Sequence, residues 1–249
     1  MQNSPPERHN IYPWLTPFDA HLRLQIEALI RKTAASPAKM VSTNEDLFEQ
    51  HSYTLNWAIH RRFNTEPFAD VTIRLGDVEL PAHGIILASQ SEYFKTALES
   101  PMKEGIERKF EFNEGSMHAH WRMVEYIYTG QYDHDAAAPL GLIADDEDLL
   151  KDVRVYQLAD YFQVENLKYY AFQQFKTRIK RLWVAESFVD CIRYVYGIPN
   201  NVSYDMRTEI AKIALKHLAD LWDKKIFRTL IREGGDFVID ILKLIVSSN

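Results

Sequence analysis

The sequence predicts an α+β fold, in which a small sheet with a β-hairpin is flanked by helices and followed by an all-helical C-terminal extension. Two observations support this. Between residues 68 and 80 apolar side chains alternate with polar ones, which is typical of strands, whereas after residue 147 they recur at helical spacing. We therefore expect an N-terminal extension with two helices over 1–63, a mixed domain over 64–178 and a helical extension over 179–249.

The composition indicates a globular protein, because 46% of the 249 residues are hydrophobic. A net charge of -6 argues against nucleic acid as a partner, since phosphate binding relies on clustered Lys and Arg. No apolar run reaches the roughly 18 residues of a membrane-spanning helix, so we expect no membrane partner and a location in the cytoplasm, the nucleus or both. The single cysteine, Cys191, excludes an internal disulfide and cannot form a structural zinc site alone.

Two helices are predicted before the mixed domain. The first begins near Pro17, because Thr16 suits the N-cap and apolar residues follow at helical spacing. The second runs from about Glu45 to Arg62 and carries an apolar stripe that has to be buried against another surface. The stripe consists of Leu47, Phe48, Leu55, Ala58 and Ile59.

The mixed domain begins with the hairpin. Val71, Ile73 and Leu75 alternate with polar residues, and Gly76 begins a turn before the alternation resumes as far as residue 80. Next we expect two short helices, a strand and a longer helix with Gly130 as its C-terminal cap, over 82–89, 91–100, 109–114 and 116–130. A loop over 131–147 precedes five helices, over 148–162, 164–180, 183–196, 203–219 and 221–246, with an interruption of the last at Gly234-Gly235.

The run FADVTIRLGDVELPAHGIILASQSEYFKTAL, from Phe68 to Leu98, resembles the BTB/POZ family, and most closely the BTB-only proteins of filamentous fungi. The matching residues are Asp70, Gly76, His83, Ser91, Tyr93 and Phe94. Further on, VEYIYTGQY (124–132) and VYQLADYFQVENLK (155–168) are similar to later helices of the family, so the resemblance covers about 64–178. It implies a BTB/POZ fold and a function in protein–protein interaction.

The resemblance also implies a homodimer. In the family, the helix after the hairpin and the helix before it form a two-fold interface. The candidate interface residues are Leu47, Phe48, Leu55, Ile59, Ile85 and Ile86. The alternative is that helix 45–62 covers the core of its own subunit.

A second implied feature is a cullin contact. BTB adaptors that recruit a cullin often carry a hydrophobic residue, any residue and then Glu after the aromatic-rich helix, and Met102-Lys103-Glu104 occupies that place. Met102 would fill an apolar pocket and Glu104 would accept hydrogen bonds; the alternative is a solvated helix end. The resemblance thus implies a module that tethers an unknown target protein, either as substrate adaptor of a cullin-based ubiquitin ligase or as a scaffold for transcriptional or other regulatory assembly.

One position departs from the family pattern. Members that bind corepressors usually have Lys or Arg directly after Ala-His, where it pairs with the Asp of the hairpin, and here that position is Gly84. We therefore expect Asp70 to lack a cationic partner and to accept backbone hydrogen bonds or face solvent, since a buried unpaired carboxylate is costly.

No catalytic, cofactor or metal site is predicted, and we expect no enzyme. His118 and His120 lie on nearly opposite sides of a predicted helix, so they cannot share a metal. The acidic runs 133–135 and 145–148 are expected to be a solvated loop that favours the N-terminus of the next helix, and the basic run 176–181 a solvated helix end. Cys191 and the aromatic residues Tyr169, Tyr170, Phe172 and Phe175 are expected to be mainly core.

Overall fold

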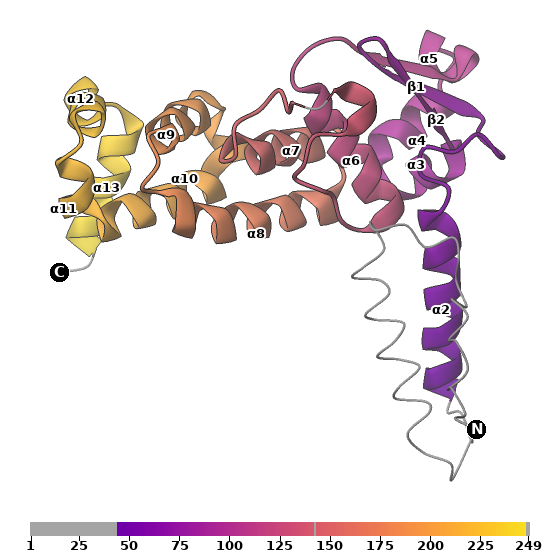
Figure 1. The fold of residues 1–249 in the computed structure, drawn as a ribbon, viewed down its shortest axis with the longest axis horizontal. Helices are drawn as coiled ribbons and strands as arrows, with labels where there is room; N and C mark the ends of the chain where they lie inside the picture. The colour runs from indigo at the N-terminus through magenta and orange to yellow at the C-terminus, as the bar shows by residue number, and fades with distance from the viewer. Residues whose placement is uncertain (1–43, 142, 248–249) are drawn as a thin grey trace, which may run out of the picture. The chain divides into compact units, whose positions relative to one another are not determined.

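The computed structural model describes residues 44–141 and 143–247. The chain divides after Ser52 into two compact units, of which the second, Tyr53–Asn249, contains the sheet and all the helices that follow it. The predicted helix that begins near Pro17 lies outside the described residues. Helix α2, Asn44–His60, spans the point of division and agrees with the helix predicted over 45–62 (Figure 1).

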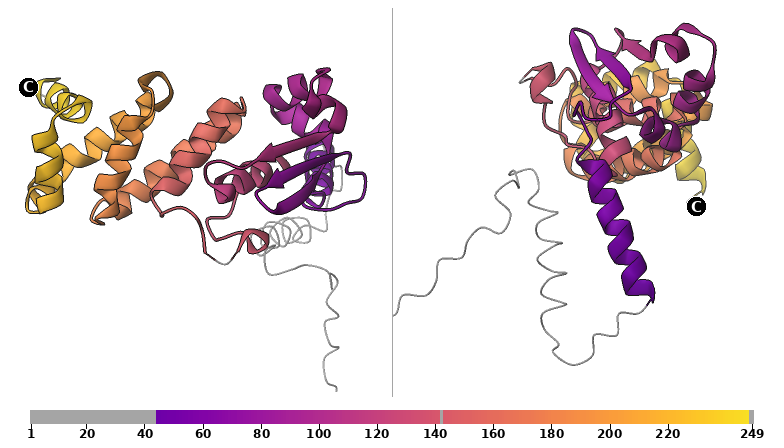
Figure 2. Two further views of the ribbon diagram at one scale, coloured as in Figure 1. Left: turned by 90° about the horizontal axis from the view of Figure 1, so that it is seen from above. Right: turned by 90° about the vertical axis from the view of Figure 1, so that its right-hand side faces the viewer.

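The sheet has three strands in the order β2-β1-β3. β1 (Val71–Leu75) and β2 (Val78–Ala82) form the predicted antiparallel hairpin, drawn as neighbouring arrows in Figure 2. β3 (Lys109–Phe112) pairs with β1 in parallel. Ile73 lies between Leu80 and Phe110 in this register, and all three side chains are buried, so the apolar face predicted from the alternation forms the core.

Four helices surround the sheet in the chain segment that carries the predicted motifs: α3 (Gly84–Gln90), α4 (Glu92–Glu99), α5 (Lys103–Glu107) and α6 (Met117–Thr129). The Ser91 hydroxyl caps α4 by accepting a hydrogen bond from the Phe94 amide. Gly130 ends α6 in the left-handed conformation, as predicted. The sequence did not predict α5, which has only five residues.

The remaining helices are α7 (Leu150–Tyr161), α8 (Glu165–Leu182), α9 (Ser187–Gly197), α10 (Asn200–Lys216), α11 (Leu218–Trp222), α12 (Lys225–Glu233) and α13 (Asp236–Ser247). α7 lies along α8, and α9 packs on α10 (Figure 1). The break predicted at Gly234-Gly235 separates α12 from α13, with positive φ at both glycines. The helix predicted over 203–219 starts earlier and is interrupted at His217.

The loop before α7 contains one short 3-10 turn, Ala138–Leu140. Among the helices of residues 44–141 and 143–247, none combines the length and the apolar character needed to span a bilayer.

Candidate protein-interaction surfaces

Part of the apolar surface predicted for dimerisation is exposed in the single chain. On α3, Leu87 is fully buried and Ile86 packs against the core, but Ile85 is 82% exposed. On α2, Ile59 packs against the core whereas Leu55 is exposed. Leu47 and Phe48 are also exposed. The alternative, in which α2 covers the core of its own subunit, therefore holds for Ile59 but not for Leu55. Exposed apolar residues of this kind are typical of an interaction surface.

The side chain of Asp70 is fixed at the start of the hairpin. Its Oδ1 accepts a hydrogen bond of 2.7 Å from the Gly84 amide, as expected. The expectation that Asp70 lacks a cationic partner is wrong, because Nη1 of Arg108 lies 3.4 Å from Oδ2. A Cβ atom on Gly84 would come within 3.0 Å of that same Nη1, so the glycine leaves room for the guanidinium. The cation that the family pattern places after Ala-His is supplied here from the end of α5.

Two further motif residues have structural roles. The backbone amide of His83 donates to the Tyr128 hydroxyl at 2.7 Å, and its ring nitrogens contact that hydroxyl and the Pro67 carbonyl. Burial is the main cause that raises the pKa of Tyr128 to about 12, so the hydroxyl keeps its proton. Ser91 donates to the carbonyl of Phe162 at 2.6 Å while it caps α4. These residues hold the hairpin and α4 to later helices.

The candidate cullin contact lies at the start of α5. Met102 is the N-terminal flanking residue of this helix and is 69% exposed, and Glu104 lies half-buried in its first turn. Gly105 brings the helix close to the end of α4, since a Cβ atom there would collide with the carbonyl oxygens of Ser100 and Ala97. The charge of Glu104 contributes, after burial and Tyr161, to the raised pKa of Tyr93 on α4.

An open groove of about 1020 Å³ begins at Tyr93. Its walls come from α4, the end of β3, the start of α6, α7 and α9. The aromatic residues that line it are Tyr93, Phe112, His120, Tyr161, Phe162 and Tyr194. The rings of Tyr93 and Tyr161 lie 5.5 Å apart, and Tyr161 is 64% exposed. Burial lowers the pKa of His120, which stacks on Phe112, so the imidazole favours its neutral form.

Three acidic residues, Glu111, Glu114 and Asp145, line the groove together with Arg154. Glu111 is paired with Arg74 and Lys109 at 3.8 and 3.3 Å. α4 contributes Tyr93 to the groove and packs against α5, so Met102, Glu104 and the groove belong to neighbouring elements. We call this region, consisting of Met102, Glu104 and the groove-lining residues, the α5–groove surface. Its exposed aromatic and apolar side chains suit an apolar helix or segment of a partner.

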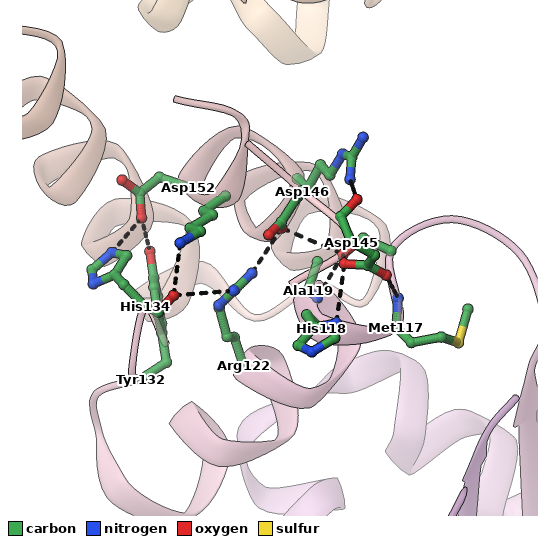
Figure 3. Close-up of polar contacts among 12 residues, drawn as sticks. Met117, His118, Ala119, Arg122, Tyr132, His134, Asp145, Asp146 and Asp152 are labelled. Carbon is green, nitrogen blue, oxygen red and sulfur yellow. Dashed lines mark hydrogen bonds and ion pairs between the residues drawn. The ribbon is translucent and has the colours of Figure 1, made fainter. Parts of the chain in front are cut away.

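The expectation that the acidic residues 145–148 form a solvated loop is wrong for Asp146 (Figure 3). Asp145, Glu147 and Asp148 are exposed. Asp146 forms a 2.8 Å ion pair with Arg122, and both side chains are almost wholly buried. Asp145 accepts hydrogen bonds from the Ser116 hydroxyl at 2.6 Å and the Met117 amide at 2.7 Å. It therefore stabilises the N-terminus of α6, an earlier helix than the one expected.

A second buried carboxylate, Asp152, fixes the segment 132–134. It accepts hydrogen bonds from the Tyr132 hydroxyl, His134 Nε2 and Arg178 Nε at 2.7, 2.9 and 2.9 Å. Burial and this carboxylate hold the pKa of Tyr132 well above its usual range. Arg178 belongs to the basic run predicted as a solvated helix end, so that prediction is wrong for this residue. With Arg122, whose guanidinium donates to the Asp133 carbonyl, this network ties α6, the loop and α7 together (Figure 3). Arg178 links it to α8.

The remaining candidates have structural places. His118 and His120 are both buried, and His118 Nδ1 lies 3.2 Å from Asp145. Cys191 is buried as predicted, and burial raises the pKa of its thiol to about 12, which leaves it unreactive. Phe175 is buried and Tyr170 and Phe172 pack against the core, so the aromatic residues of α8 are mainly core as predicted, and Tyr169 is the exposed one of the four. In the described part of the chain no three His, Cys, Asp or Glu residues are placed to hold a metal ion.

Comparison with known proteins identifies the domain to which most of these residues belong. Residues 59–179 match the family model described as the BTB/POZ domain, so this segment is a BTB/POZ domain, as the resemblance predicted. The predicted limits of 64–178 and of the extensions on either side stay predictions.

Curated relatives include Kelch-like protein 28 of Homo sapiens, 33% identical over 95 residues, or 38% of this chain and 16% of that protein. Kelch-like protein 38 of Mus musculus is 32% identical over 101 residues, 39% of this chain and 17% of that one. The chain thus spans less than a fifth of the length of these relatives.

Among solved structures, the BTB (Tramtrack and Bric a brac) domain of human Gigaxonin aligns with 55% of this chain and 98% of its own, at 24% identity and a TM-score of 0.37.

Proposed function

We propose that the protein is an interaction module that homodimerises through its BTB/POZ domain and tethers a target protein as substrate adaptor of a cullin-based ubiquitin ligase. On this proposal it acts in the cytoplasm, the nucleus or both. The identity of the target and the finer likeness to fungal BTB-only proteins stay open predictions.

The observation that carries the adaptor role is the α5–groove surface. Met102 is exposed at the start of α5 and Glu104 lies in the first turn of that helix. α4 packs against α5 and places Tyr93 beside Tyr161 in the groove. An exposed apolar anchor beside a carboxylate and a row of aromatic side chains can bind one face of a partner helix. Burying Met102 and Tyr161 would also remove two large apolar side chains from solvent.

Affinity capture tests this role directly. The full-length protein is expected to capture a purified cullin, and Met102→Ala with Glu104→Ala is expected to weaken that capture at least about tenfold, because anchors at the centre of an interface contribute that much. Tyr161→Ala should weaken it as well.

Lys103 provides a matched control. It lies between the two candidate residues, its side chain is largely exposed, and its contact with Glu107 at 3.9 Å is a surface ion pair. Lys103→Ala should leave capture unchanged, and so should Tyr169→Ala, which removes an exposed tyrosine of α8. Capture that is absent in the wild-type protein, or equal in the double variant, contradicts the adaptor role.

The ion pair of Asp70 and Arg108 favours a second candidate, a scaffold for transcriptional or other regulatory assembly. The pair provides a charged site beside the N-terminus of α3, although the residue after Ala-His is Gly84. A regulatory partner that binds there would be lost with Arg108→Ala and retained with the Met102 and Glu104 double variant. A cullin partner would show the opposite pattern.

A further inference from the structure

The last described helix, α13, has apolar residues on two of its faces. Phe237, Ile241 and Leu244 follow at spacings of four and three and pack toward the core, where α13 contacts α9 and α10. A second stripe, Ile239, Leu242 and Val246, follows at spacings of three and four and is exposed by 50%, 54% and 74%. Ile245, beside it, is also exposed. A helix that is apolar on opposite faces is normally covered on both.

The charges next to this stripe are unevenly distributed along α13. The first half carries Asp236 and Asp240, and the second half carries Lys243. Asp236 lies 3.3 Å from Arg207, and Asp240 accepts from the Tyr196 hydroxyl at 3.1 Å, so both carboxylates are held in place by α9 and α10. The Lys243 side chain is 70% exposed, although its ammonium contacts Asp240 at 3.1 Å. An acidic group of a partner would share this exposed ammonium with Asp240.

We propose that the exposed stripe of α13 binds the same stripe of a second copy of this chain, with the two helices antiparallel. This arrangement places Leu242 of each copy near the two-fold axis and Ile239 near Val246 of the other copy. It also brings Lys243 of each copy to the acidic half of its counterpart and aligns the helix dipoles favourably. A parallel arrangement would instead put like charges together.

The contact is separate from the candidate dimer surface of the BTB/POZ domain, which involves α2 and α3. A chain with two different two-fold contacts forms assemblies larger than a dimer. One helix stripe is small compared with a standard interface, so the pairing of two single chains is weak. In a chain that is already dimeric, two such contacts act together and strengthen the association.

Light scattering of the full-length protein over a range of concentrations tests the proposal. The wild-type mass is expected to rise with concentration, and Leu242→Asp is expected to weaken this association at least about tenfold, because the central anchor is lost and two acidic groups meet. Lys243→Glu should weaken it less. Ser247→Asp introduces the same charge on the polar side of α13 and should leave the association unchanged.

Unfolding in urea shows whether the variants remain folded, which is expected because Leu242 is exposed. If the wild-type protein and Leu242→Asp have the same mass at every concentration, the proposal is wrong, and the stripe serves another protein or a lipid surface. That comparison holds whether or not the BTB/POZ domain dimerises. In a protein without that dimer, the wild type would change from monomer to dimer and Leu242→Asp would stay monomeric.

Discussion

At the scale of single residues, a buried ion pair holds the loop between α6 and α7 to α6. Asp146 and Arg122 form an ion pair in which both side chains are almost wholly buried. The Arg122 guanidinium also donates to the Asp133 carbonyl at 3.0 Å. A buried pair is not strongly stabilising by itself, but removing one partner leaves the other charge buried without compensation. Arg122 is therefore the residue at which this loop is most sensitive to substitution.

Arg122→Met is expected to lower the free energy of unfolding by about 3–5 kcal/mol, because it leaves the Asp146 carboxylate buried beside an apolar side chain. Urea unfolding followed by circular dichroism measures the change. Lys95→Met removes a cation from an exposed pair with Glu92 and serves as the control, with no measurable shift of the midpoint expected. Equal midpoints for both variants would show that the Arg122 pair does not stabilise the fold.

Glu125 predicts a specific pH dependence of stability. Burial is the main cause that raises the pKa of its carboxyl from 4.5 to about 7. Because the folded-state pKa lies above the unfolded one, the protonated carboxyl favours the folded state. The contribution of this group to the free energy of unfolding, up to about 3 kcal/mol, is complete below pH 4.5 and is lost as the pH rises to about 7.

Glu125→Gln removes this titration. Relative to the wild-type protein, the variant should become more stable between pH 5 and pH 7.5, with the difference measured by urea unfolding at both values. The amide retains an oxygen that can accept from the Asp133 amide, which Glu125 contacts at 3.2 Å. A difference between the two proteins that does not change with pH would contradict the raised pKa.

At the scale of elements, the long helices and the hairpin follow local sequence signals, and α5 does not. Its five residues are too few for a periodic pattern, and it forms because Gly105 allows close packing against the end of α4. Likewise, Asp145 caps α6 across 28 residues of sequence. The sequence predicts caps only within a few residues of a helix end, so this contact could not be predicted.

Gly105→Ala tests the role of α5. The added Cβ atom would collide with the backbone oxygens of Ser100 and Ala97, so α5 has to move and carry Met102 and Glu104 with it. We expect at least about tenfold weaker cullin capture while the sheet and the helical part stay folded. Gly197→Ala places a Cβ atom in open space at the end of α9 and should change neither capture nor stability. If Gly105→Ala captured the cullin as well as the wild-type protein does, α5 would not be part of the cullin-binding site.

At the scale of the whole molecule, the proposed BTB dimer makes a prediction about mass. In the Leu242→Asp background, which removes the α13 contact, light scattering should give twice the chain mass of 29.1 kDa. Adding Ile85→Asp should reduce it to a monomer, because a charge is placed where apolar surfaces meet. Tyr169→Asp, at another exposed position, is the control. A mass that stays at twice the chain with Ile85→Asp would place the dimer contact elsewhere.

The sequence by itself determined the α+β class, the hairpin, most of the helices and the likeness to the BTB/POZ domain, because periodicity, caps and short motifs are local signals. It also placed Met102 and Glu104 at a candidate contact. Only the tertiary structure decided which of the charges are buried. Arg108 contacts Asp70 although 38 residues separate them in the sequence. Asp152 accepts hydrogen bonds from Tyr132 and His134 of the loop and from Arg178 of α8. A carboxylate is stable in the interior only where folding brings a cation or hydrogen-bond donors to it. Because these partners are distant in the sequence, a local sequence pattern does not show which carboxylates will be buried.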